Sequence, residues 1–374
     1  MTAGAGHRRA AEAIAQALAA AHPESAIECR DLLDDVPAWL RWFYPRVYYF
    51  LIRRTPWLWG GSFELLDWRP VYPLVRSLRR AWNVLMARRF IRRLRHAPYD
   101  LILVTHFFPA DVASACKRAG WIRAPLVVMV TDLYPHRFWL SPEAEAYAFA
   151  TEEGARVARE RGIAPGRLHV TGIPIAAEFH AAFDRAELER QLGLVSGRRT
   201  ALVTSGGSTV GPFEQVVAEL ANLESAVPGQ LQLLVICGHD QCAVERLRAR
   251  ARGWTMPVRA LGFIDTMPQA MAVSDLVVAK AGGLTVAEAL GRGLPLVIFH
   301  TIPGQERMNA EHAAAHGAAI VAGSPGEAAS AVRRFVEEPT FSEAMRRSAR
   351  ALSRPHAAQT IVSDIVQPLL ERQK

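Results

Sequence analysis

The chain of 374 residues is long enough for two domains of ordinary size, each with its own buried core. Half of its residues are hydrophobic and 21% are charged, which is ordinary for a globular protein. No apolar run approaches the ~18–20 residues of a membrane span, no signal peptide is recognisable, and four scattered cysteines without a Cys-x-x-Cys pair argue against a zinc site or a disulfide framework.

The first half of the chain alternates apolar runs of β type with helical patterns. The predicted strands are Ala26–Cys29, Leu101–Thr105, Leu126–Thr131, Tyr147–Thr151 and Leu168–Val170, and the predicted helices are Arg8–Ala20, Asp111–Ala119 and Glu152–Arg161.

His7 follows Gly4 and Gly6 and precedes the first predicted helix. Because a helix N-terminus disfavours imidazolium, the ring should stay neutral and able to accept a proton, which makes His7 a candidate general base. The alternative is that His7 only caps the helix. Asp132 ends a predicted strand, where it would orient His7, replace it as the base, or merely cap a turn.

The net charge of +8 is concentrated in residues 36–95, which hold thirteen arginines against two acidic residues and therefore carry +11. The same segment holds six of the nine tryptophans, among them Trp39, Trp42, Trp57 and Trp59. Arginine beside tryptophan and tyrosine is typical of a membrane interface, where guanidinium groups meet anionic head groups. We therefore expect peripheral binding to anionic membrane lipids, in preference to a solvated surface over a tryptophan core or to nucleic acid.

The second half repeats the alternation, and each strand precedes a helical stretch. Its predicted strands are Thr200–Thr204, Leu231–Cys237, Val258–Leu261, Leu276–Ala279, Leu296–Phe299 and Ala319–Val321. Continuous hydrophobic strands alternating with helices predict an α/β fold of parallel sheets covered on both faces. We expect two doubly wound domains, joined near Pro174–Asp184 and facing each other across a cleft.

Two glycine-rich turns follow predicted strands and precede helices. They are Ser205-Gly206-Gly207-Ser208 and Gly282-Gly283-Leu284-Thr285. Unpaired N–H groups and partial positive charge at a helix N-terminus bind a diphosphate without a metal. Because the chain has no Asp-x-Asp element to hold a metal, such groups would have to stabilise a leaving diphosphate. Taken singly, either turn could need glycine for backbone reasons alone.

Polar residues beyond the second turn complete the predicted nucleotide-sugar site. Glu288 lies within the following helix, where its carboxylate can accept hydrogen bonds from two ribose hydroxyls. Gln305 and Glu306 open the next helix and offer an amide and a carboxylate to a sugar. Arg307 and Asn309 are further candidates for sugar hydroxyls or phosphate.

In this order the motifs resemble those of the monogalactosyl- and processive glucosyl-diacylglycerol synthases, UDP-sugar transferases that build membrane glycolipids. That family is related to the transferase that glycosylates the lipid-linked peptidoglycan precursor. The matching segments are Gly4-Ala5-Gly6-His7, Val130-Thr131-Asp132, Val170-Thr171-Gly172-Ile173-Pro174, Ser205-Gly206-Gly207 with Gly211-Pro212, Cys237-Gly238, Gly262-Phe263 and residues 280–309.

The resemblance implies a GT-B fold of two Rossmann-like domains. Residues 1–174 would bind the acceptor and the membrane, residues 185–354 would bind the UDP-sugar, and a tail helix over 355–374 would pack back on the first domain. The family has a β-strand before the Gly4–His7 motif, but only three residues precede it here. We therefore expect either a true start upstream of Met1 or an incomplete first sheet.

The resemblance also implies roles for single residues. His7 would face the acceptor, and the loop that holds His136 and Trp139 would line the acceptor side. Phe263 and Ile264 would hold the uracil ring, unless Phe263 is a core residue.

These observations predict an inverting, metal-independent glycosyltransferase without a cofactor, acting at the cytoplasmic face of the membrane. It would move a hexose from UDP-glucose or UDP-galactose to diacylglycerol or a similar lipid. Three alternatives are transfer of N-acetylglucosamine to a polyprenyl-linked acceptor, a nucleotide-sugar epimerase, and a non-catalytic nucleotide-binding protein of the lipid surface. A dehydrogenase, suggested by Gly4, Gly6 and Glu28, does not explain the motifs of the second half.

Overall fold

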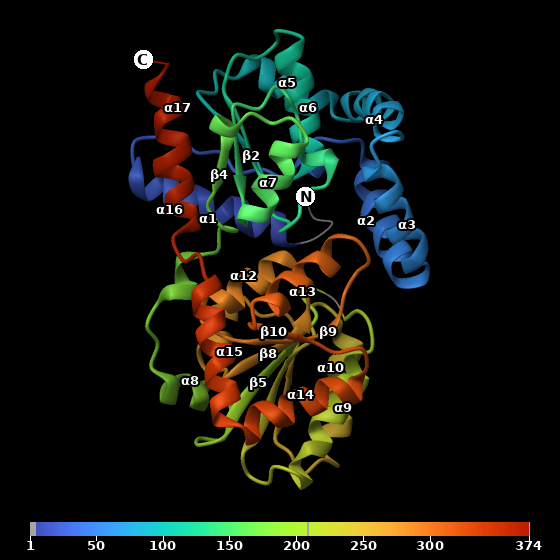
Figure 1. Cartoon of the computed structure of the whole chain (residues 1–374), viewed down its shortest axis with the longest axis vertical. Helices are drawn as coiled ribbons and strands as arrows, with labels where there is room; N and C mark the ends of the chain where they lie inside the picture. The colour runs from blue at the N-terminus through green and yellow to red at the C-terminus, as the bar shows by residue number, and fades with distance from the viewer. Residues whose placement is uncertain (1–4, 208, 374) are drawn as a thin grey trace. The chain divides into compact units, whose positions relative to one another are not determined.

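The computed structural model describes residues 5–207 and 209–373. The chain divides into two compact units, each built on its own parallel sheet (Figure 1). The first unit consists of Met1–Ala176, Pro303–Gln305 and Arg354–Lys374, and the second of Ala177–Ile302 and Glu306–Ser353. The α/β fold with two parallel sheets is thereby confirmed.

A four-stranded sheet in the order β1-β2-β3-β4 forms the centre of the first unit. Its strands are β1 (Ile102–Val104), β2 (Leu126–Met129), β3 (Ala146–Phe149) and β4 (Leu168–Val170). Its helices are α1 (Ala5–Ala21), α2 (Ala38–Arg54), α3 (Pro56–Asp67), α4 (Tyr72–Met86), α5 (Arg88–His96), α6 (Phe107–Arg118), α7 (Glu152–Glu160), α16 (Ala357–Ile361) and α17 (Gln367–Glu371). Since successive side chains of a strand point to opposite faces, the full burial of β2 and β3 means that both faces of the sheet are covered.

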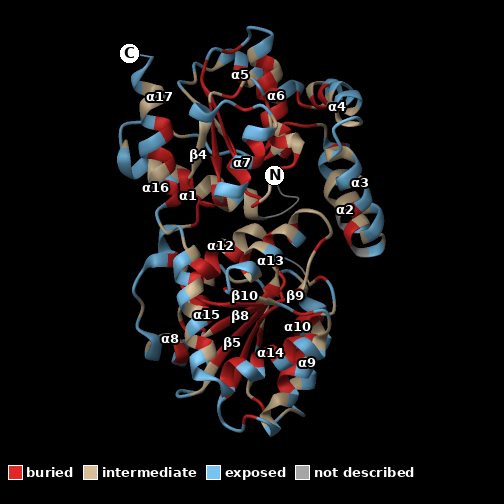
Figure 2. Cartoon of the chain, viewed as in Figure 1, coloured by how far each residue is buried: buried red, intermediate tan, exposed pale blue. Residues whose placement is uncertain are grey.

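The second unit has a six-stranded sheet in the order β10-β9-β8-β5-β6-β7. Its strands are β5 (Arg199–Thr204), β6 (Leu231–Ile236), β7 (Val258–Leu261), β8 (Leu276–Lys280), β9 (Leu296–His300) and β10 (Ala319–Val321). Its helices are α8 (Arg185–Leu192), α9 (Phe213–Ala221), α10 (Gln241–Ala251), α11 (Met267–Ala272), α12 (Gly283–Gly291), α13 (Gln305–Ala315), α14 (Pro325–Glu337) and α15 (Pro339–Leu352). Buried residues concentrate in this sheet and on the helix faces that cover it (Figure 2).

The tail of the chain returns to the first unit. Five residues of π-helix, Val362–Val366, connect α16 to α17, and α16 packs against α1. Gly172, just beyond β4, makes room for this return, because a Cβ added to it would lie 2.4 Å from the Cβ of Arg354. Its φ of +89° also favours glycine.

The predicted strands are confirmed, with one exception. Ala26–Cys29 forms no strand; this segment is largely exposed, and Glu28 bonds instead with the Tyr99 hydroxyl. A run of four residues that no neighbouring strand pairs has no sheet to join, whatever its propensity. Gly4 and the strand expected before it lie outside the described residues.

Candidate functional site

Two strands at the centre of the second unit's sheet, β5 and β8, mark the point where the strand order reverses. From β5 the chain continues outward to β6 and β7, and from β8 it continues in the opposite direction to β9 and β10. In open α/β sheets, ligands bind beyond the carboxyl ends of the strands at such a point. The two predicted glycine-rich turns are the loops that follow β5 and β8.

The loop after β5 is held by close backbone packing. Gly206 has a φ of +83°, a left-handed conformation that favours glycine. A Cβ added to Gly238, in the loop after β6, would lie 2.7 Å from the carbonyl oxygens of Gly206 and Gly207. The backbone N–H of His239 donates to the Gly207 carbonyl at 3.1 Å, and Ser205 Oγ accepts a hydrogen bond from a backbone N–H farther along the loop. These contacts fix the loop against its neighbour.

Gly207 is different, because no packing contact explains its lack of a side chain. Within the described part of the chain, a Cβ added to Gly207 would meet no atom within 4 Å. The backbone is therefore bare at this point, which is what the close approach of a phosphate to backbone N–H groups requires.

Lys280 ends β8 and lies between the two glycine loops. A Cβ added to Gly282 would lie 3.1 Å from Lys280 Nζ, and one added to Gly206 would lie 3.7 Å from Lys280 Cε. Nζ forms an ion pair with Oε1 of the buried Glu306, whose Oε2 accepts the backbone N–H of Ile302 at 3.0 Å. Lys280 was not predicted as a site residue, although a lysine at the end of a central strand and directly before a glycine turn is a signal that could have identified it.

The helix that follows the second turn is present as predicted. Gly282 is the N-cap of α12 and Gly283 its first residue, so the first-turn N–H groups are available as donors. Leu284 and Thr285 are half-buried in that turn, and Glu288 is buried farther along the helix.

The helix α13 begins at Gln305, which is half-buried. Both carboxylate oxygens of Glu306 already have partners, as described above. Asn309 is fully buried, and its Nδ2 donates to the carbonyl of Ala281 at 2.9 Å. Asn309 therefore fixes the start of the second glycine loop from α13.

Phe263 follows β7 at the same edge of the sheet and is 44% exposed, which excludes the alternative of a core residue. The His239 ring stacks on it with centroids 4.4 Å apart and an interplanar angle of 9°. The neighbouring Ile264 is half-buried. The stacked rings of His239 and Phe263 therefore lie beside the first glycine loop, because the backbone of His239 is bonded to that loop.

His7 lies near the start of α1, which begins at Ala5 rather than at Arg8 as predicted. Thr105, one residue beyond β1, donates from Oγ1 to the His7 carbonyl at 2.8 Å. Thr131, two residues beyond β2, has its Oγ1 2.7 Å from His7 Nδ1. Two adjacent strands therefore hold the main chain and the ring of one histidine.

The His7 ring is neutral at neutral pH. Burial lowers its pKa to about 4, and burial likewise lowers the pKa of His106, whose ring lies edge-on at 4.7 Å, well below the usual value. The neutral ring was predicted, but burial rather than the helix terminus is the main cause. Asp132 accepts a hydrogen bond from Trp139 Nε1 at 3.0 Å. The hydroxyl of the preceding residue, Thr131, contacts the His7 ring.

His136 and Trp139, predicted on the acceptor side, are both buried. Nδ1 of His136 accepts the backbone N–H of Phe138, and Nε2 lies 3.0 Å from the carbonyl oxygen of Phe63. Burial lowers the pKa of His136 below its usual value. Both side chains brace the loop after β2 from within the unit rather than at a membrane surface.

Three of the four tryptophans predicted to contact the membrane, Trp39, Trp42 and Trp57, are exposed, and Trp57 is 73% exposed. This excludes the alternative that they form a helical core. Trp59 is half-buried and packs edge-on against Tyr48.

Helix α4 has a reversed amphipathic pattern. On its inward face, Arg79 Nη2 and Asn83 Nδ2 lie 3.0 and 2.9 Å from the carboxylate of the buried Asp111 in α6. Its exposed side carries large apolar residues at helical spacing: Leu74, Leu78, Trp82 and Leu85. Leu74 and Leu78 are 79% and 74% exposed. An exposed apolar stripe of this kind marks a surface that contacts a membrane or another protein.

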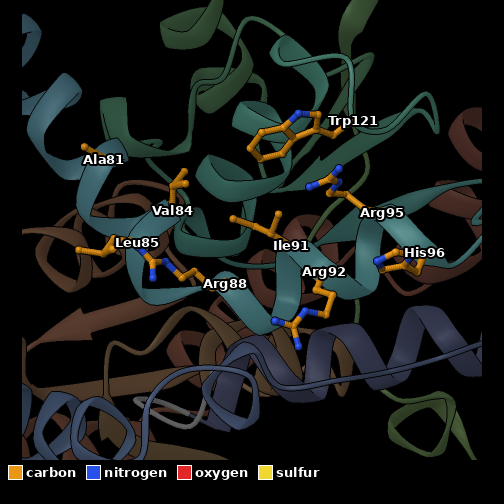
Figure 3. A pocket seen from close by; sticks show the side chains of 9 residues that line it. All are labelled: Ala81, Val84, Leu85, Arg88, Ile91, Arg92, Arg95, His96 and Trp121. Carbon is orange, nitrogen blue, oxygen red and sulfur yellow. The ribbon is translucent and has the colours of Figure 1, made fainter.

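A groove of about 620 Å³ lies between α4 and α5 (Figure 3). Its apolar lining includes Val84, Leu85, Ile91 and Trp121, and its charged lining includes Arg88, Arg92 and Arg95. The three arginines follow one another at intervals of three or four along α5, and the Arg95 guanidinium lies 5.1 Å from the centre of the Trp121 ring. The groove therefore combines positive charge with the end of the exposed stripe at Leu85.

Within residues 5–207 and 209–373, no cluster of three His, Cys, Asp or Glu side chains is arranged to hold a metal ion. No helix in the same ranges is long and apolar enough to cross a membrane.

Two family models match the chain in succession. The monogalactosyldiacylglycerol (MGDG) synthase model matches residues 7–175, and the glycosyltransferase family 28 C-terminal domain matches residues 200–361. A probable monogalactosyldiacylglycerol synthase 2 of Oryza sativa subsp. indica is 30% identical over 97% of this chain and 78% of its own length. A processive diacylglycerol beta-glucosyltransferase of Bacillus pumilus is 28% identical over 73% of this chain and 69% of its own length.

Solved structures share the fold at low sequence identity. MnaA of S. aureus with UDP aligns with a TM-score of 0.60 and 15% identity, covering 79% of this chain and 82% of that one. MurG of Acinetobacter baumannii aligns with a TM-score of 0.56 and 18% identity, covering 76% of this chain and 78% of that one. The two parallel α/β units are therefore of the GT-B type.

Proposed function

Because the chain belongs to the monogalactosyldiacylglycerol synthase family of glycosyltransferases, we propose that it transfers glucose or galactose from a UDP-sugar to the hydroxyl of diacylglycerol or a similar membrane lipid. The relatives named above support this acceptor, since their names specify diacylglycerol products.

The observation that carries the proposal is the pair of glycine loops after β5 and β8, with Lys280 between them. One diphosphate could be bound by three groups: the backbone N–H groups at Gly207, the N–H groups at the N-terminus of α12 and the Lys280 ammonium. Each of them favours negative charge. Phe263 would hold the uracil, Glu288 the ribose, and Gln305 with Glu306 the sugar. The loops occupy the place in the sheet where nucleotides bind.

The acceptor hydroxyl is deprotonated by His7 in this proposal. As its O–H bond breaks and the proton moves to His7, the oxygen attacks the anomeric carbon from the face opposite UDP. The bond from that carbon to the diphosphate breaks, and its electron pair leaves with UDP, so the configuration inverts. A neutral imidazole is required, and His7 is neutral because burial lowers its pKa to about 4.

The developing negative charge on UDP would be met by fixed donors rather than by a metal. Backbone N–H groups and an ammonium that are already in position need no reorganisation as the charge develops. We infer that Lys280 and the N-terminus of α12 supply this stabilisation.

The basic helical segment would bind the cytoplasmic face of the membrane. The stripe from Leu74 to Leu85 would enter the interface, while Arg88 and Arg92 of the groove would bind lipid phosphates. No ion pair is formed by either arginine within the described residues, so their charge is available to head groups. Membrane binding would therefore weaken at high salt.

The proposal is tested by product formation on liposomes that contain diacylglycerol and an anionic phospholipid. UDP-glucose, UDP-galactose and UDP-N-acetylglucosamine are offered separately, each with and without a chelator. We expect glycosyl-diacylglycerol from one hexose donor, at the same rate in the chelator.

Other outcomes would replace the proposal by its alternatives. Transfer of N-acetylglucosamine, and only to a polyprenyl-linked acceptor, would identify the chain as an N-acetylglucosaminyltransferase for polyprenyl-linked acceptors. UDP binding without turnover of any donor, together with indifference to His7→Ala, would identify a non-catalytic nucleotide-binding protein.

A further inference from the structure

We propose that Thr131 is a positioning residue that holds the His7 imidazole as the Nδ1–H tautomer, so that Nε2 presents the lone pair that accepts the lipid hydroxyl proton. This inference rests on the proposed role of His7 as the base.

The geometry restrains the histidine at two points. The strands β1 and β2 are paired neighbours, and each is followed by a threonine whose hydroxyl contacts His7. Thr105 holds the His7 carbonyl, and Thr131 holds Nδ1 at 2.7 Å. Thr131 is buried, so water does not readily replace its hydroxyl as the partner of the ring.

The tautomer decides whether the ring can act. A neutral imidazole donates from one nitrogen and accepts at the other. If the Thr131 hydroxyl donated to Nδ1, Nε2 would carry the ring proton and could not take another. With Nδ1–H donating to Thr131 Oγ1, Nε2 takes the acceptor proton, the imidazolium keeps its bond to Thr131, and the extra proton passes to water after UDP leaves.

A neutral partner suits this site. A carboxylate beside the ring would raise its pKa and favour imidazolium before the acceptor arrives, whereas a hydroxyl orients the ring without adding charge. The His106 ring, whose pKa is lowered by burial, lies edge-on to the His7 ring, and Asp132 accepts from Trp139, whose ring centre lies 6.0 Å from that of His7. Thr131 can therefore set the tautomer without charging the ring.

The test compares Thr131→Val, which removes the hydroxyl at nearly constant shape, with Thr131→Ser, which keeps it. In Thr131→Val we expect kcat to fall roughly 10–100-fold, the range of a misplaced acid–base group, with the KM for the UDP-sugar unchanged. Thr131→Ser should recover most of the rate. Long-range ¹H–¹⁵N spectra should show the Nδ1–H pattern for His7 in the unsubstituted protein and a shift towards Nε2–H in Thr131→Val. The His7 signals are identified by their loss in His7→Gln.

The outcomes separate this inference from the function beneath it. The positioning role is overturned if Thr131→Val keeps the wild-type kcat. It is also overturned if the His7 tautomer is unchanged and the loss of rate follows a lower Tm. Full activity of His7→Gln overturns the proposed base itself.

Discussion

The Lys280 ammonium is already paired with the buried Glu306 before any ligand arrives, so its position is fixed in advance. Glu306 is held in turn by the backbone N–H of Ile302. A diphosphate bound by the glycine loops would meet a cation that does not have to be ordered first. Removing either partner of such a pair leaves an unpaired buried charge, which destabilises the fold as well as the site.

Substitution of Lys280 should separate these two effects. Lys280→Met is expected to lower kcat by roughly 100–1000-fold, the typical loss of one electrostatic stabiliser, and also to lower Tm. The double variant Lys280→Met/Glu306→Gln should recover Tm but not kcat, because it removes the buried charge without restoring the cation. Recovery of kcat in the double variant would mean that Lys280 serves only the fold.

Gly207 allows a probe of the ligand that leaves the fold alone. Because a Cβ on Gly207 meets no atom of residues 5–207 and 209–373 within 4 Å, Gly207→Ala should keep the wild-type Tm. The added methyl group would occupy the space of a phosphate, so the affinity for UDP, measured by calorimetry, should fall at least tenfold. Gly326→Ala, where a Cβ also meets nothing, is the matched control. Equal UDP affinity in both variants would place the diphosphate elsewhere.

Some residues of the candidate site could be predicted from the sequence and others could not. The Gly282-Gly283 turn was predicted because a strand, a glycine pair and a helix are consecutive in the chain. The bond between Thr131 and His7 joins residues 124 positions apart and depends on where the start of α1 lies against the loop after β2. Local patterns contain no such information, so the sequence suggested three roles for Asp132 and none for Thr131.

At the scale of elements, α4 shows why the basic segment was not predicted as helices. Arg79 and Arg80 bond inward to Asp111 while the leucines of the helix are exposed, so the apolar face is not the face that packs on the core. Periodicity can identify a helix. Which face of α4 is buried, however, is decided by Asp111, a buried carboxylate distant in the sequence that bonds to the polar face. Composition led to the prediction of a membrane interface without any helix being assigned, and the exposure of the α4 stripe agrees with a contact surface of some kind.

The exposed stripe of α4 should determine membrane affinity. Leu74→Gln/Leu78→Gln is expected to weaken co-sedimentation with anionic vesicles severalfold, because two residues of about three-quarters exposure no longer enter the interface. The double variant Val195→Gln/Val321→Gln removes exposed apolar residues of the second unit and is the control. Equal losses in both double variants would show that the stripe is not specific.

At the scale of the whole molecule, three neutral histidines, the half-buried His7 and the buried His106 and His136, make stability depend on pH. The pKa of His7 is lowered from 6.5 to about 4, and the pKa values of His106 and His136 are lowered too. Below about pH 6.5 the unfolded chain binds protons on these rings, whereas the folded chain does not. The free energy of unfolding therefore decreases as the pH is lowered from about 6.5 towards about 4.

We expect urea unfolding midpoints to fall steadily from pH 7 to pH 5. His7→Gln should show a shallower fall, because one of the three rings with a lowered pKa is gone. Identical slopes for the two proteins would assign the effect to other groups.

The same low pKa predicts that the catalytic rate stays constant from pH 8 to about pH 5, since His7 remains neutral there.

The packing of α16 against α1 has a consequence for biosynthesis. Nearly all of the first unit comes from two segments, Met1–Ala176 and Arg354–Lys374, and the second unit is encoded between them. During translation α1 emerges early, but its apolar partner Ala357–Ile361 leaves the ribosome only after the second unit has been made. The first unit therefore waits, with part of α1 uncovered, until the last residues arrive, and a chain that stops after Ser353 never completes it.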